Sequence, residues 1–153
     1  MRKKRILFCS EATFLNTGYA TYTREILSYL HGTGKYELAE MASYGERNDP
    51  RATNIPWKYY GVVPNQANEP KASQEELEFA ERSPFRGYFK WAIMPTVDAR
   101  PQARQWVATY QSADACFTYS DWAGHILRDQ SGDKINYLGS SPPSAHPAYK
   151  PIE

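Results

Sequence analysis

Residues 5–34, RILFCSEATFLNTGYATYTREILSYLHGTG, decide the fold class of this 153-residue chain. The run at 5–10 is apolar without alternation, which is typical of a strand buried on both faces of a parallel sheet. Apolar residues then recur at helical spacing over 19–31, and Gly32 ends that pattern. The stretch therefore predicts a βα unit whose strand is the first and central one of a sheet.

The rest of the chain repeats this alternation of strand and helix. Further strands are expected at 36–44, 57–63, 88–94, 113–119 and 134–138. Helices are expected at 101–111, from Ser120 or Asp121 onward, and near 77–80, where Ser83-Pro84 stops the last of these. Such an order predicts parallel βαβ crossovers. We expect one α/β domain over 1–153, Rossmann-like, with a mostly parallel sheet and helices on both faces. Residues 64–76 are expected to form a surface loop or insert, and residues 139–153 a proline-rich tail.

Composition argues against several classes of partner. Lys and Arg number 18 against 17 Asp and Glu, so the chain lacks the one-sign field of a nucleic-acid binder. No apolar stretch has the length of a membrane span. Cys9 and Cys116 form no CxxC pair and lie in apolar runs, which predicts two buried thiols in a reducing compartment. We expect a cytoplasmic protein that binds no nucleic acid.

Ligands of open parallel sheets bind outside the carboxyl ends of the strands, so the residues that follow each strand are the site candidates. Asn16, Thr17, Gly18 and Tyr19 lie between the first strand and its helix. A helix N-terminus in this position attracts anions such as the diphosphate of a nucleotide sugar. An Asn-Thr-Gly turn that only caps a helix has the same sequence, and both interpretations stay open.

Three carboxylates are expected at this edge. Glu11, Asp98 and Asp121 each follow a predicted strand, and a carboxylate there can take the proton of an attacking hydroxyl. Asp98 is the first choice for the acceptor contact, and Glu11 is the second catalytic candidate. For Asp121 the competing interpretation is a helix cap, because Ser120-Asp121 precedes an apolar helical pattern.

Other chemistries find no support in the sequence. The three histidines are scattered without a metal-binding spacing, so no metal site is expected. The serines near the end lack the strand-to-helix GxSxG setting of a hydrolase nucleophile. The aromatic residues Trp57, Tyr59, Tyr60 and Trp91 have strand spacing, which favours core packing over base stacking.

Four segments together carry a resemblance to a known family. They are KKRILFCSEATFLNTGYATYTREILSYL at 3–30, ERSPFRGYFKWAIMPTVDA at 81–99, DACFTYSDW at 114–122 and INYLGSSPPSAHPAYKP at 135–151. In this order they resemble the N-terminal, acceptor-side domain of retaining GT-B glycosyltransferases. The resemblance implies half of a GT-B fold, in which this domain holds the acceptor and a C-terminal domain holds the nucleotide sugar.

The resemblance also implies roles for particular residues. Asn16, Thr17, Gly18 and Tyr19 match the loop that faces the donor phosphates. Asp98 follows the strand whose end faces the acceptor. The loop Tyr119, Ser120 and Asp121 matches another part of the acceptor cleft.

Two departures from the family lead to further expectations. The stretch from Gly139 to Pro151 matches the segment that leads to the donor domain in the family, and that domain is absent from this chain. Relatives also carry a helix and an apolar strand between the loop at 64–76 and the ERSPF segment. We therefore expect that the strand at 88–94 pairs directly with the strand at 6–10, or that a second copy of the chain covers the gap.

The functional expectation is a glycosyltransferase-like acceptor domain that contributes to sugar transfer when a donor-binding domain complements it. The isolated chain is not expected to transfer sugar, because the donor half supplies the groups that stabilise the departing diphosphate. The alternative is a non-catalytic binding or assembly module that keeps the half-fold. A third interpretation is a small nucleotide-binding protein that uses the 16–19 loop.

Overall fold

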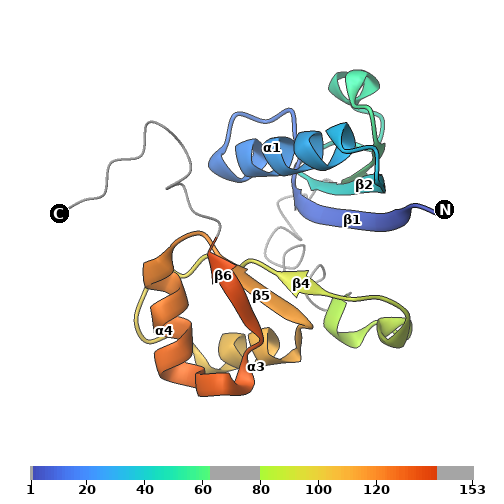
Figure 1. Ribbon diagram of the computed structural model, residues 1–153. Helices are drawn as coiled ribbons and strands as arrows, with labels where there is room; N and C mark the ends of the chain where they lie inside the picture. Colours follow the sequence, from blue (N-terminus) through green and yellow to red (C-terminus); the bar gives the residue numbers. More distant parts are fainter. Residues whose placement is uncertain (1, 63–79, 141–153) are drawn as a thin grey trace. The chain divides into compact units, whose positions relative to one another are not determined.

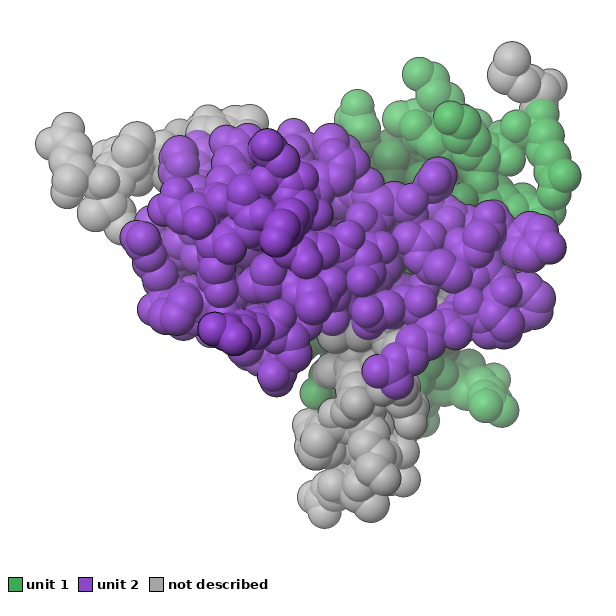
Figure 2. All heavy atoms as spheres, turned by 90° about the horizontal axis from the view of Figure 1, so that it is seen from below, with its two compact units in different colours: residues 1–76 green, residues 77–153 purple. Residues whose placement is uncertain are grey.

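The computed structural model describes residues 2–62 and 80–140, and the chain divides into two compact units, 1–76 and 77–153 (Figure 2). The predicted loop at 64–76, most of the helix predicted at 77–80 and the tail beyond residue 140 lie outside the described residues. Residues 80–82 are helical and Ser83 is not, so this helix ends where Ser83-Pro84 predicts.

The first unit contains the predicted βα unit and two further strands (Figure 1). Its elements are β1 (Lys4–Glu11), α1 (Gly18–Gly32), β2 (Tyr36–Ser43), a 3₁₀ turn η1 (Pro50–Asn54) and β3 (Lys58–Val62). The Thr17 hydroxyl caps the start of α1, and Gly34, with a φ of 67°, lets the chain turn into β2. Each predicted element is present within about two residues of its expected bounds.

The three strands of this unit form a parallel sheet in the order β1-β2-β3. Lys4 pairs with Tyr36 at one end of the first ladder, and Glu11 pairs with Ser43 at the other. The central strand is therefore β2, and the prediction that the first strand is central is wrong for this sheet. Parallel pairing through α1 confirms the predicted crossover.

One face of this sheet is covered by α1. Leu38, Glu40 and Ala42 alternate along β2 and are buried. On the opposite face, Leu7 is 46% exposed and Cys9 is exposed. Burial of the first strand on both faces, and of the Cys9 thiol, was predicted wrongly, because no described helix packs on that second face.

The second unit repeats the plan with two helices. Its elements are a 3₁₀ turn η2 (Arg86–Tyr88), β4 (Ala92–Ile93), α3 (Arg104–Ser112), β5 (Ala115–Thr118), α4 (Asp121–Ser131), a 3₁₀ turn η3 (Gly132–Lys134) and β6 (Tyr137–Ser140). The strands pair in parallel in the order β4-β5-β6. Val107 of α3 and Leu127 of α4 belong to one buried cluster with Cys116 of β5, so both helices cover the same face. Burial of the Cys116 thiol is confirmed.

The strand predicted at 88–94 is reduced to Ala92–Ile93. Side-chain bonds to Asp114 hold the residues before it. The Asp114 carboxylate accepts the Trp91 N–H at 2.8 Å and a Lys90 hydrogen bond at 3.1 Å. Arg86 forms an ion pair with the same carboxylate at 2.8 Å. The Asp114 carboxylate thus accepts the Trp91 N–H that a neighbouring strand would otherwise bind, so residues 88–91 are held without strand pairing.

The described residues thus form an α/β protein with two separate three-stranded parallel sheets. The single sheet with helices on both faces is not what they show, since the helices of each unit cover one face. Among the described strands, β4 pairs with β5, and β1 pairs with β2. The predicted pairing of 88–94 with 6–10 is not among these ladders.

Candidate functional site

At the carboxyl end of β1, Thr17 and Glu11 organise the turn into α1. The Thr17 side-chain oxygen accepts the N–H of Ala20 at 3.1 Å, which satisfies a free donor of the first helical turn. The Thr17 hydroxyl itself donates to the Glu11 carboxylate. The capping role of the 16–19 loop is therefore present, and Glu11 is already bound to a hydroxyl.

The remaining loop residues are open to solvent. Asn16 and Gly18 are exposed, and Tyr19 is 43% exposed. A Cβ placed on Gly18 would meet nothing within 4 Å, so the first turn has space in front of it. Glu11 places a negative charge beside this helix start, which opposes binding of a second anion there. The geometry suits a hydroxyl-bearing ligand better than a diphosphate.

A buried carboxylate lies on the covered face of the same sheet. Glu40 is 1% exposed, and its two oxygens accept the Thr13 hydroxyl at 3.2 Å and the Trp57 indole N–H at 3.0 Å. Burial raises the pKa of Glu40 above its ordinary value. Because both oxygens are satisfied within the protein, Glu40 ties β2 to the turn after β1.

The turn after β2 follows a strand end, as the site candidates do, and contacts among neighbouring residues close it. The Tyr59 hydroxyl donates to the Glu46 carbonyl at 3.0 Å. Arg51 donates to both carboxylate oxygens of Asp49, at 2.9 and 2.8 Å, and lowers the pKa of Asp49 to about 2. These contacts give the turn a structural role.

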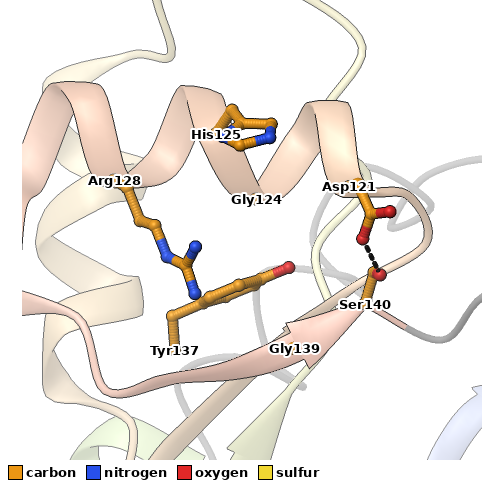
Figure 3. Close-up of a pocket in the computed structure, with 7 residues that line it drawn as sticks. All are labelled: Asp121, Gly124, His125, Arg128, Tyr137, Gly139 and Ser140. Carbon is orange, nitrogen blue, oxygen red and sulfur yellow. Dashed lines mark hydrogen bonds between the residues drawn. The ribbon is translucent and has the colours of Figure 1, made fainter.

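The second unit has a hollow of about 190 Å³ between α4 and β6 (Figure 3). It is lined by Asp121, Gly124, His125, Arg128, Tyr137, Gly139 and Ser140. Three of these side chains come from one side of α4, at spacings of four and three residues, which places them on a common helix face. The hollow is smaller than the roughly 300–1,000 Å³ of a typical ligand pocket, so its size suits a small molecule.

Tyr137 lies against α4 because residue 124 has no side chain. A Cβ on Gly124 would stand 2.2 Å from the Tyr137 hydroxyl oxygen. Thr118 donates its hydroxyl proton to the Ser120 carbonyl at 2.8 Å, so the 2.9 Å contact with Tyr137 uses the Tyr137 proton. The ring of Tyr137 is therefore held in a defined position under the helix.

The polar ends of the hollow carry opposite charges (Figure 3). At one end, Ser140 donates its hydroxyl to the Asp121 carboxylate. At the other end, the Arg128 guanidinium lies over the Tyr137 ring, 4.6 Å from its centroid. Within residues 2–62 and 80–140, no protein acceptor takes a hydrogen bond from Arg128 or His125. Arg128 is thus positioned by stacking while its donors remain available.

Of the other residues predicted for the acceptor cleft, Tyr119 and Ser120 directly precede α4, and Asp98 follows β4. Ser120 is the N-cap of α4 and accepts the Ala123 N–H at 3.3 Å, so the cap is Ser120 and Asp121 is the first helical residue. Tyr119 is half-buried. Asp98 is exposed beyond β4 and is not a lining residue. Burial raises the pKa of Tyr110, and the charge of Asp98 adds a smaller contribution.

Sequence reasoning missed the residues that carry the basic end of the hollow. No role was expected for His125, and neither Arg128 nor Tyr137 was a candidate. The spacing of Asp121, His125 and Arg128 along one helix face was the available signal. The stacking partner was not visible, because Tyr137 reaches α4 only through the parallel pairing of β5 and β6.

Searches for other kinds of site and for relatives give negative findings. No group of three His, Cys, Asp or Glu side chains suited to hold a metal ion exists in the part of the chain that the structure describes. Among the same residues, no helix combines the length and apolar character needed to cross a membrane. Comparisons of the chain with protein-family models, curated proteins and solved structures find no match.

Proposed function

We propose that the chain is a glycosyltransferase-like acceptor domain, which binds a hydroxylated acceptor while a donor-binding domain supplies the nucleotide sugar. The observation that carries the proposal is the hollow between α4 and β6, whose Asp121 and Ser140 end lies where the parallel strands β5 and β6 end. Sites of open parallel sheets occur at this edge. Its Asp121 carboxylate accepts a hydroxyl, that of Ser140, as it would accept the hydroxyl of a sugar.

The edge of the first unit supports the same assignment in a weaker form. Glu11 accepts the Thr17 hydroxyl, and the space before Gly18 is open. A sugar hydroxyl that replaced Thr17 as the donor would meet a carboxylate able to accept its proton. Asp98 stays the first candidate for an acceptor contact, and Asp98 and Glu11 stay the two catalytic candidates.

A purified donor-binding domain of a GT-B enzyme provides the test. We expect labelled sugar to pass from a nucleotide sugar to an added carbohydrate when both proteins are present, and no transfer with either protein alone. Asp98→Asn and Glu11→Gln should each lower the transfer rate, by about 10²–10⁴-fold where the side chain acts as the base. Arg104→Gln, a change of an exposed residue on α3, is the control. Absence of transfer with a panel of nucleotide sugars would contradict the catalytic part.

A non-catalytic binding module is the second candidate, and one observation favours it. The edge carboxylates Glu11 and Asp121 are already bonded to hydroxyls. Among the described residues, burial raises the pKa of the Glu40 carboxyl, which is sealed inside the first unit. Perturbed groups exposed in a cleft are the usual mark of catalysis. Carbohydrate binding without transfer under every donor condition would favour the module. Affinity for nucleoside diphosphates alone would favour the nucleotide-binding interpretation.

A further inference from the structure

We propose that the hollow between α4 and β6 binds a phosphorylated sugar, with its phosphate on Arg128 and a sugar hydroxyl on Asp121. This proposal rests on the proposed function, because it specifies the class of ligand that the acceptor domain takes.

Arg128 offers the hollow a set of hydrogen-bond donors. A guanidinium presents five N–H donors in a planar fork that matches phosphate oxygens. The ring of Tyr137 fixes the plane of this guanidinium, with 4.6 Å between the Arg128 Cζ and the ring centroid. No acceptor among the described residues uses these donors. A positioned guanidinium with open donors at the wall of a hollow is suited to bind an anion.

The Tyr137 ring under Arg128 is itself held in place. Tyr137 donates its hydroxyl proton to Thr118, whose side chain is fully buried. Gly124 provides the space for this hydroxyl beside the helix. The platform under Arg128 is thus anchored in the core, so Arg128 loses less freedom on binding than an unsupported surface arginine.

Asp121 gives the opposite end of the hollow a negative charge. Asp121 and Arg128 are seven residues apart, which separates their backbones by roughly 10 Å along the helix. Asp121 repels an anion and accepts hydroxyls, whereas Arg128 attracts the anion. His125, exposed on the same helix face between them, adds a further nitrogen donor. A ligand with hydroxyl groups at one end and a phosphate at the other complements this order of charges.

Binding measured by calorimetry on the full chain tests the proposal, with glucose 6-phosphate, glucose and inorganic phosphate as probes. We expect glucose 6-phosphate to bind at least tenfold more tightly than either other probe, a difference of about 1.4 kcal/mol. Arg128→Gln should abolish this preference. Arg128→Lys should retain part of it, because the charge remains while the planar fork is lost. The control Arg104→Gln should leave all three affinities unchanged.

A further variant separates recognition from loss of folding. Asp121→Asn should weaken glucose and glucose 6-phosphate by the same factor and keep their ratio. Thermal melts of every variant show whether the second unit is still folded, and the Arg128→Lys result keeps the test valid if Arg128→Gln unfolds it. Equal affinity for glucose and glucose 6-phosphate, or a preference that survives in Arg128→Gln, would overturn the proposal.

The outcomes also distinguish this proposal from the proposed function. Transfer to neutral sugars without a phosphate preference would overturn the phosphate assignment and leave the acceptor domain in place. Tight binding of glucose 6-phosphate, lost in Arg128→Gln, with no transfer under any donor condition would support the ligand assignment and reject the catalytic role. If inorganic phosphate binds as tightly as glucose 6-phosphate, the sugar half of the assignment is wrong.

Discussion

The two units share a plan of three parallel strands with helices on one face, yet their polar residues at and near the strand ends differ. In the first unit, carboxylates accept hydrogen bonds from the unit's own side chains, Glu40 from Thr13 and Trp57, and Asp49 from Arg51. In the second unit, Arg128 stacks on Tyr137 and donates to no described residue. Both units thus use carboxylates for cohesion, Asp114 doing so in the second, and the second unit in addition leaves the donors of Arg128 available.

The largest expected loss of stability comes from shortening one buried leucine in each unit. Leu27 of α1 and Leu127 of α4 are both 0% exposed, so replacing each by Ala should cost about 2–5 kcal/mol of unfolding free energy. Leu127 packs in a cluster whose members all belong to the second unit. We expect hydrogen exchange of Leu127→Ala to show lost protection in residues 80–140, and that of Leu27→Ala in residues 2–62. Equal loss in both units from either variant would show that they unfold together.

A change at Trp57 tests cohesion in the first unit. Trp57→Phe removes the donor to one oxygen of the buried Glu40, and an unsatisfied buried acceptor costs about 1–3 kcal/mol. Urea denaturation measures the loss. The control is Trp122→Phe, because Trp122 is 54% exposed and its replacement should change stability by less than about 0.5 kcal/mol. Equal effects of the two variants would mean that the Glu40 bond contributes nothing.

Gly124 provides the corresponding test in the second unit. Gly124→Ala places a methyl group 2.2 Å from the Tyr137 hydroxyl oxygen, and overpacking of this kind costs about 1–3 kcal/mol. Displacement of Tyr137 should also weaken the binding of glucose 6-phosphate. Gly87→Ala is the control, since a Cβ there would meet nothing within 4 Å. A Gly124→Ala protein with unchanged stability and binding would show that the ring is free to move.

The smallest expected effects concern how stability depends on pH. Glu40 and Asp114 should contribute to this dependence with opposite signs. Burial raises the pKa of Glu40, so the folded state binds more protons than the unfolded state, and stability falls as pH rises above 4.5. The hydrogen bond from the Trp91 N–H, with Lys90 and Arg86, lowers the pKa of Asp114 from 3.8 to about 2. Its contribution is present above pH 3.8 and is lost as pH falls toward 2. Glu40→Gln and Asp114→Asn should each remove one of these slopes in denaturation curves measured from pH 2 to 7. If Glu40→Gln or Asp114→Asn leaves the pH dependence of stability unchanged, that carboxyl is not its source.

Local structure was largely predictable from the sequence. The span 5–34 predicted β1 and α1, because apolar periodicity and the glycines after the helix act over a few residues. Ser120 was predicted as one of two caps for the same reason. The strand at 88–94 was predicted too long, since Asp114, more than twenty residues away, binds the segment through its carboxylate. The candidate site was predictable only in part: Asp121 was expected, whereas Arg128 and Tyr137 were not.

The order of elements and the parallel direction of the strands were determined by the sequence alone, because hydrophobic pattern and turn residues specify them locally. Which strand is central, which faces are covered and which side chains share a hollow were decided only by tertiary structure. Register and packing join residues distant in the chain, as when β6 brings Tyr137 beneath Arg128 and Gly124 leaves the space for it. The spacing of residues along the sequence does not show which distant residues meet in space.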